Sequence, residues 1–218
     1  MPNWTYNNVQ FIGKTEDSVK KLKELLKSKD NDFDFNNIIP IPLALTETVS
    51  GSENAKPDWQ KEQSEKLKKQ HGFDNWYDWS LANWGTKWGA YEGSIIDEGR
   101  VTFQTAWATP YNAMTTLSAK FPNVIITVHY ADEDFGHNVG QYILEGGTEV
   151  SQDTPQGGSE EAIRMALDIR GGQDYYLGEG ISYMSEEELE EVKNGTNNYD
   201  SVFLNIIYDD KIVDEEFF

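Results

Sequence analysis

Hydrophobic and polar residues alternate in several short segments, a pattern typical of β-strands. The predicted strands cover residues 4–12, 33–41, 100–107, 123–131 and 137–145, and the last of these can pair back on its predecessor as a hairpin. Within 100–107, the period of two predicts that Trp107 shares a face with Val101 and Phe103. A further apolar segment, residues 201–208, has the composition of a buried strand.

Helices are predicted between these strands, where apolar residues recur every three or four positions. Capping residues and first-turn prolines mark their starts: Thr15, Pro57, Asp74, the pair Thr109 and Pro110, Ser159, and the capping box that begins at Ser185. Gly72, Gly85 and Gly171 fit the ends of three of these helices, because glycine accepts the left-handed backbone that often follows a last turn.

The order of these elements predicts the fold class. From residue 4 to residue 131 the order is strand, helix, strand, insertion, strand, helix, strand, which is the split βαβ pattern of an α+β, ferredoxin-like antiparallel sheet. We expect a ferredoxin-like domain over residues 1–147, with a helical, tryptophan-rich insertion at 43–99. Residues 148–218 are expected to form an acidic C-terminal α/β extension that packs on, or continues, the same domain.

Charge is distributed unevenly along the chain. The 218 residues include 18 Lys and Arg against 38 Asp and Glu, a formal net charge of −20. Residues 1–72 are neutral overall, whereas residues 130–218 carry 22 acidic against 4 basic residues. Direct binding to nucleic acid is not expected, since phosphate contacts need Lys and Arg, and an anionic membrane surface is disfavoured for the same reason.

The residue types present exclude further classes of protein. The chain has no Cys, so it has neither disulfides nor thiolate chemistry. Its first residues show no basic segment followed by an apolar run, and no apolar stretch approaches the roughly 20 residues of a membrane span.

Five motifs occur in a distinctive order: MPNW with Asn7, FDFNNIIPIP, WYDWSLANWGTKW, TAWATPYNAMTTLSAKFP, and YADEDFGHNVG. Together they resemble the YubB-like family, the ferredoxin-like domain of phage and plasmid proteins, over about residues 1–147. The resemblance implies a ferredoxin-like fold, an origin on a mobile genetic element, and a location in the cytoplasm of a host bacterium. It brings no established catalytic residues.

The first candidate site is a tryptophan-rich block that comprises Trp76, Trp79, Trp84, Lys87, Trp88 and Trp107. Tryptophan dominates binding hot spots, so one interpretation is a patch that binds a ligand or a partner. The other is a small core that anchors the insertion on the sheet, because buried Trp supplies much of a core's area. Composition by itself favours the second interpretation, a small core.

The second candidate is the segment between His129 and His137, which contains Asp132, Glu133 and Asp134. Two imidazoles and three carboxylates could bind a divalent metal. However, strand alternation sends neighbouring side chains to opposite faces, and the HExxH spacing is absent. A solvated hairpin turn is therefore favoured over a metal site.

The third candidate is an acidic surface that comprises Asp132, Glu133, Asp134, Glu160, Glu161, Glu186, Glu187, Glu190 and Glu191. High net charge keeps a protein soluble, which is a sufficient reason for such residues. The functional alternative is a surface that imitates nucleic-acid phosphates and steers a basic partner towards the chain.

We therefore expect a phage- or plasmid-encoded accessory protein that binds a host or rival protein with a basic surface, in the manner of a counter-defence inhibitor that imitates nucleic-acid charge. The alternative is a small-ligand-binding protein or enzyme with an aromatic pocket at the insertion. A function without catalysis is favoured, no cofactor or metal is predicted, and the sequence leaves the oligomeric state open.

Overall fold

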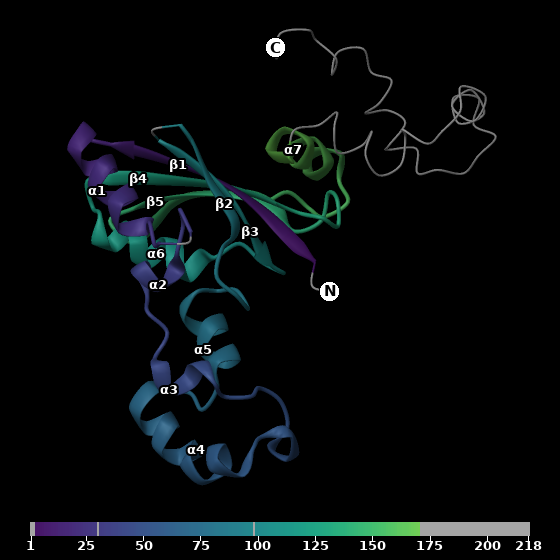
Figure 1. Ribbon diagram of the computed structural model, residues 1–218. Helices are drawn as coiled ribbons and strands as arrows, with labels where there is room; N and C mark the ends of the chain where they lie inside the picture. The colour runs from purple at the N-terminus through teal and green to yellow at the C-terminus, as the bar shows by residue number, and fades with distance from the viewer. Residues whose placement is uncertain (1–2, 30, 98, 171–218) are drawn as a thin grey trace, which may run out of the picture.

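The computed structural model describes residues 3–29, 31–97 and 99–170 (Figure 1). The strands are β1 (Trp4–Gly13), β2 (Tyr91–Asp97), β3 (Arg100–Ala106), β4 (Val124–Asp132), β5 (Val139–Glu145) and β6 (Thr148–Asp153). The helices are α1 (Glu16–Leu26), α2 (Phe35–Ile38), α3 (Leu43–Thr46), the 3-10 turn η1 (Glu53–Ala55), α4 (Asp58–His71), α5 (Trp76–Asn83), α6 (Tyr111–Lys120) and α7 (Glu160–Arg170). None of the helices in these ranges is long and apolar enough to cross a membrane.

The six strands form one antiparallel sheet in the order β2-β3-β1-β4-β5-β6. The first four strands in this order, with α1 after β1 and α6 between β3 and β4, are the ferredoxin-like arrangement. Strands β5 and β6 extend that sheet at its β4 edge. The predicted α+β, ferredoxin-like class is therefore confirmed.

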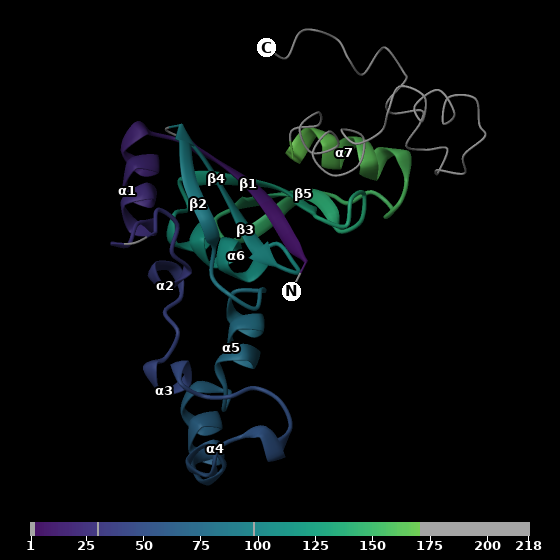
Figure 2. The ribbon, with the colours of Figure 1, turned by 45° about the vertical axis from the view of Figure 1, so that its right-hand side comes forward.

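One face of the sheet carries the main hydrophobic core. Alternate residues of the strands, such as Val9 in β1, Phe103 in β3 and Ile126 in β4, point to this face and are almost completely buried. Helices α1, α2 and α6 cover it, and Leu22 of α1 and Leu117 of α6 belong to the same cluster (Figures 1 and 2). These helices therefore hold the central strands β1, β3 and β4 in place.

The opposite face is covered at one end by α7 (Figure 2). Ala162, Ala166 and Ile169 of α7 pack on Ala131 of β4 and Val139 of β5 in a second, smaller cluster. The helix predicted from the cap at Ser159 is confirmed, and small alanines on its inner side let it lie close to the strands.

The prediction of a strand over 33–41 is wrong, and the corresponding strand of the fold is β2. Asp34 ends the extended run because its side chain accepts a hydrogen bond from the Asn36 N–H at 2.9 Å and caps the short helix α2. Phe33 and Phe35 are completely buried in the main core, where they contact Phe103 of β3. Strand β2 lies inside the expected insertion range 43–99, and its register shifts against β3 disrupt a regular alternation.

Smaller differences concern the ends of elements. Helix α4 ends at Gly72 in the left-handed conformation as predicted, with φ at 80°. The N-cap of α5 is Asn75, not Asp74, and α6 begins at Tyr111 after Pro110 instead of being capped by Thr109. Strand β6 was not predicted, because its mostly exposed residues lack an apolar face. The helix after Ser185 and the strand over 201–208 lie outside the described residues.

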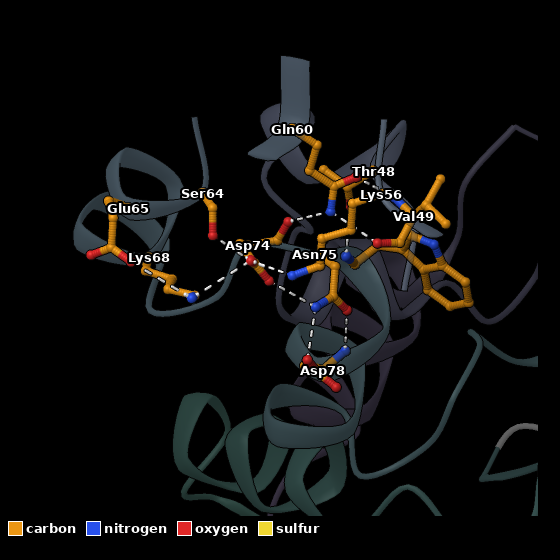
Figure 3. A network of polar contacts seen from close by, with 11 residues as sticks. Thr48, Val49, Lys56, Gln60, Ser64, Glu65, Lys68, Asp74, Asn75 and Asp78 are labelled. Atoms are coloured by element: carbon orange, nitrogen blue, oxygen red, sulfur yellow. Dashed lines mark hydrogen bonds and ion pairs between the residues drawn. The ribbon is translucent and has the colours of Figure 1, made fainter. Parts of the chain in front are cut away.

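The insertion extends away from the sheet and consists of α3, η1, α4 and α5 (Figure 1). Its polar centre is Asp74, whose carboxylate lies 2.7 Å from the Lys56 ammonium and accepts hydrogen bonds from Ser64 and Asn75 (Figure 3). Burial raises the pKa of Asp74, but these hydrogen bonds outweigh it and hold the pKa well below its ordinary value.

Gln60 completes this centre by bonding both to the Val49 backbone and to the Asp74 carbonyl. The network joins α4 to the start of α5, where Asn75 also accepts a hydrogen bond from the Asp78 N–H (Figure 3). It therefore holds the start of α5 against α4.

Candidate functional site

Three chain segments converge at one end of the sheet, where β1 begins and its neighbours β3 and β4 end. Trp4 pairs with Ala106 of β3, and Thr5 pairs with Asp132 of β4. Asn3, Trp107 and the turn over 133–138 continue directly from these paired residues. Antiparallel pairing thus brings residues more than 100 positions apart in the sequence to one place.

Trp107 leaves the sheet in a backbone conformation that is rare for a bulky residue. Its φ is 70°, in the left-handed region, and its side chain is 44% exposed. Two backbone contacts hold this conformation: its N–H donates to the Asn3 carbonyl at 2.9 Å, and its carbonyl accepts from the Asn138 side-chain amide at 3.1 Å. The prediction that Trp107 continues the buried face of β3 is wrong, because the left-handed turn redirects its ring to the surface.

Lys87 places its ammonium over two indole rings of this surface. The Nζ atom lies 4.3 Å from the ring centroid of Trp88 and 4.8 Å from that of Trp107. Trp4 stacks on Tyr91 at 5.2 Å and tilts against Trp88 at 6.1 Å. These five residues form a partly exposed group, which we call the aromatic–lysine cluster.

Asp132 is buried at the edge of this cluster, so its inclusion in an acidic surface is corrected. The residue is only 4% exposed, although the sequence placed it in a solvated turn. It accepts hydrogen bonds from the side chains of Asn3, Thr5 and Asn138 at 3.1–3.2 Å and from the Asp134 N–H at 2.9 Å. All four donors are neutral, and no ion pair between described residues involves Asp132.

A surface hollow of about 300 Å³ lies between these groups. Its lining consists of Asn3, Trp107, Asp132, Asp134, His137 and Asn138. Asn138 adopts the left-handed conformation with φ at 47°, which Asn tolerates better than most residues. We call this depression the Trp107 hollow.

The structure divides the predicted tryptophan-rich block between core and surface. Trp79 and Trp84 are each 5% exposed and belong to the main core, which corrects their assignment as binding residues. The Trp84 indole also donates to the Ile39 carbonyl at 2.9 Å, and Trp76 packs partly buried against the same core. Only Trp88 and Trp107, with Lys87, remain as candidates for contact with a ligand or partner.

Of the predicted surface acids, Glu133 and Asp134 lie in the turn after β4 at this end of the sheet, and Glu160 and Glu161 lie at the start of α7. Glu133, Asp134, Glu160 and Glu161 are exposed. The turn after β4 and the start of α7 are joined by a hydrogen bond from the Gly158 N–H to the Gly136 carbonyl at 2.9 Å. Glu160 is paired with Arg164 at 2.6 Å. The other predicted surface acids, Glu186, Glu187, Glu190 and Glu191, lie outside the described residues.

The two candidate histidines face different depressions. His137 lines the Trp107 hollow, whereas His129 lines an open groove under α7 together with Met165 and Asp168. Burial lowers the pKa of His129, although a hydrogen bond with Gln141 opposes this, and burial raises the pKa of the Asp168 carboxyl. Within the described ranges, no three His, Cys, Asp or Glu side chains are grouped so that they could hold a metal ion.

Sequence reasoning missed Asn3 and Asn138, which line the hollow, and Trp4 of the aromatic–lysine cluster. A signal was present for Asn138, because a Gly-His-Asn sequence after an acidic turn offers residues that accept left-handed backbone. No local pattern identifies Asn3 and Trp4, since their partners are more than 100 residues away along the chain.

Fold and site together define a ferredoxin-like α+β protein with a partly exposed aromatic and acidic surface at one end of its sheet. A model of the family described as the ferredoxin-like domain in Api92-like protein matches residues 83–201, and the chain belongs to this family. The match covers just over half of the chain and overlaps the expected range of 1–147 only from residue 83.

One solved structure is also similar to this chain. It is the crystal structure of a protein api92 from Yersinia pseudotuberculosis, with 10% sequence identity and a TM-score of 0.38. The similarity covers 73% of this chain and 100% of the other. No match was found among curated proteins.

Proposed function

We propose that this chain is a binding protein without catalytic activity, which docks on a partner protein that presents a basic surface. The contact region is the end of the sheet where Lys87, Trp88 and Trp107 are partly exposed and where Glu133 and Asp134 lie beside them. The observation that carries the proposal is the position of Trp107, whose large ring is kept at the surface by a strained backbone conformation.

The energetics of protein interfaces support this function. A non-glycine residue at φ 70° costs on the order of 1–3 kcal/mol, and such strain is concentrated at functional positions. Tryptophan at the centre of an interface contributes a large share of binding energy, while charged residues around it guide association. Trp107 with the neighbouring acidic turn has this composition.

The biological setting of the proposal comes from the sequence motifs. The YubB-like resemblance points to an origin on a phage or plasmid, and proteins of that origin often act on factors of the host or of rival elements. An acidic protein that occupies the basic groove of a nucleic-acid-binding defence factor would act as an inhibitor by charge imitation. The net charge of −20 supports this choice of partner.

The alternative of a small-ligand pocket in the tryptophan-rich insertion has weaker support. Its central rings, Trp79 and Trp84, fill the core and are not available to line a pocket. The Trp107 hollow is open to solvent, which suits a side chain of a protein partner better than an enclosed metabolite.

Affinity capture from a host lysate, run on variants in parallel, tests the proposal. The wild-type chain should retain a partner at low salt and lose most of it at about 0.5 M salt, since added ions screen exposed charges. Trp107→Asn, which removes the ring but keeps a residue that tolerates left-handed backbone, should lose the same partner. Binding is then measured again with both components purified.

Trp59→Ala is the matched control, because Trp59 is 42% exposed but lies on α4 in the insertion. It should retain the partner as the wild type does. A partner that binds Trp107→Asn and wild type equally, or that is retained unchanged at high salt, contradicts the proposed contact region and its electrostatic basis.

A further inference from the structure

We propose that the Trp107 hollow is a socket for a single arginine side chain, which inserts from the partner protein, stacks on Trp107 and bonds to Asp134. The inference rests on the proposed function for the source of the arginine. Its chemistry depends only on the described residues of the hollow.

The hollow offers hydrogen-bond acceptors, because three of the four amide N–H groups of Asn138 and Asn3 already donate to oxygens of the protein. The Asn138 Nδ2 atom donates to the Asp132 carboxylate and to the Trp107 carbonyl, both at 3.1 Å. The Asn3 Nδ2 atom donates to the other Asp132 oxygen at 3.2 Å. Since these partners are all oxygens, both amides must turn their own oxygens away from Asp132.

Asp134 adds a charged acceptor to the lining. Its backbone N–H and carbonyl are used within the turn, by Asp132 and His137, but its exposed carboxylate has no hydrogen bond or ion pair among the described residues. A ligand that donates to this carboxylate therefore fits the hollow better than phosphate or another anion, which the carboxylate would repel.

The charge balance of the hollow favours a cation. The Asp132 carboxylate at its edge is buried, its four hydrogen-bond donors are neutral, and no ion pair between described residues involves it. Together with Asp134 it leaves two negative charges in one depression. The attraction between a positive side chain and these carboxylates is stronger in this position than between the same charges in open solvent, because the surrounding protein lowers the effective dielectric constant.

Trp107 selects guanidinium over other cations. The ring borders the hollow, and a planar guanidinium can stack on an indole while its edge donates to a carboxylate. A lysine ammonium is more strongly hydrated and cannot donate in a fork. Lys87 contacts the same ring but does not line the hollow, so it does not occupy this position.

The test uses the full chain and an acetylated, amidated nine-residue Gly/Ser peptide with one central arginine. Matched peptides carry lysine or the neutral isostere citrulline at that position. Binding is followed by the NMR shift of the Trp107 indole N–H, assigned by its absence in Trp107→Asn. We expect the arginine peptide to bind at least about threefold more tightly than the lysine peptide, and the citrulline peptide to give no saturable shift.

Asp134→Asn should weaken arginine-peptide binding by about fivefold or more, because it removes the unpaired carboxylate. Glu133→Gln removes the same charge one residue away, at a position that does not line the hollow, and should change binding by less than about twofold. Equal binding of all three peptides, a saturable shift with inorganic phosphate, or an unchanged affinity in Asp134→Asn would overturn the assignment.

This experiment can fail independently of the proposed function. If the wild type captures a partner in a Trp107-dependent manner but shows no preference for arginine peptides, the socket is wrong and the binding function stands. If arginine peptides bind as expected but no partner is captured, the socket stands and the proposed function is overturned.

Discussion

Two buried aspartates lie in different regions of this molecule, and their surroundings differ in charge. Asp74, in the insertion, and Asp132, at the end of β4, are each 4% exposed and accept several hydrogen bonds. Asp74 is paired with the Lys56 ammonium at 2.7 Å. Asp132 has only neutral donors around it.

The difference separates a structural site from a candidate binding site. Around Asp74 the donors, acceptors and charges are matched within the insertion, so the network leaves nothing for a ligand to contribute (Figure 3). Around Asp132 the hydrogen bonds are complete but the charge is not balanced. A partner can place a cation near Asp132, whereas Asp74 is already paired with Lys56.

The largest expected effect distinguishes the tryptophans of the two regions. Trp84→Ala should lower the free energy of unfolding by about 3–5 kcal/mol, because it leaves a core cavity and removes the hydrogen bond to Ile39. Trp107→Asn should change it by less than about 1 kcal/mol, since the ring is partly exposed and Asn accepts the backbone. Urea unfolding of both variants measures the difference, and similar losses would show that Trp107 is also a core residue.

The second-largest expected effect is the difference in stability loss between variants of Asp74 and Asp132. Asp74→Asn should cost about 3–5 kcal/mol, because the Lys56 side chain is 9% exposed and loses its carboxylate. Asp132→Asn leaves no buried cation behind and should cost about 1–3 kcal/mol, from donors that then face an amide nitrogen. Chemical denaturation at pH 7 tests the order, and a larger loss in Asp132→Asn would contradict it.

The same pair predicts a difference in pH dependence. Folding lowers the pKa of Asp74, so on acidification the unfolded chain binds the proton before the folded chain does. Stability therefore decreases as the pH decreases. The pKa of an aspartate in the unfolded chain is about 4. The contribution of Asp74 to stability is therefore fully present well above pH 4, and it decreases below about pH 4 by up to about 1.4 kcal/mol per pH unit.

This dependence is isolated by comparing the wild type with Asp74→Asn in urea at pH 7, 4 and 3. The difference in unfolding free energy between the two proteins should shrink on acidification, because the contribution of Asp74 decreases. The remaining carboxylates titrate in both proteins, so their effect cancels in the difference. A difference that stays constant down to pH 3 would show that Asp74 is not preferentially ionised in the folded state.

The sequence predicted the elements whose pattern is local. The spacing of Leu22 and Leu26 predicts α1, Gly72 marks the end of α4, and Ser159 marks the start of α7. Strand β2 could not be found in this way, because its pairing with β3 is irregular and Gly93 weakens its alternation. The fold class was nevertheless predictable, since two helices and three of the four strands of the ferredoxin-like pattern were assigned correctly.

The candidate site was predictable only in part. The sequence selects Trp107 and Asp134 by residue type, but their proximity depends on the pairing of β1 with both β3 and β4. The burial of Asp132 likewise follows from donors on Asn3 and Thr5, about 130 residues earlier in the chain. Composition alone therefore assigns these residues to a solvated acidic turn.

The smallest expected effect concerns Lys87, whose ammonium lies 4.8 Å from the centroid of the Trp107 ring. Lys87→Gln should lower stability by about 0.5–1 kcal/mol, because it removes cation–π contacts with Trp88 and Trp107. It should also raise the affinity for the arginine peptide about two- to fivefold, since a like charge near the ring is removed. The two effects have opposite signs, so a general loss of structure cannot produce both.

Lys66→Gln on α4 is the control, as it makes the same change in net charge far from the hollow. It should leave both stability and peptide affinity close to wild type. If Lys87→Gln instead weakens arginine binding, Lys87 assists the site by holding the Trp107 ring in place. The orientation of the Trp107 ring would then depend on its contact with Lys87 as well as on its own backbone conformation, and Lys87 would be a positioning residue of the hollow.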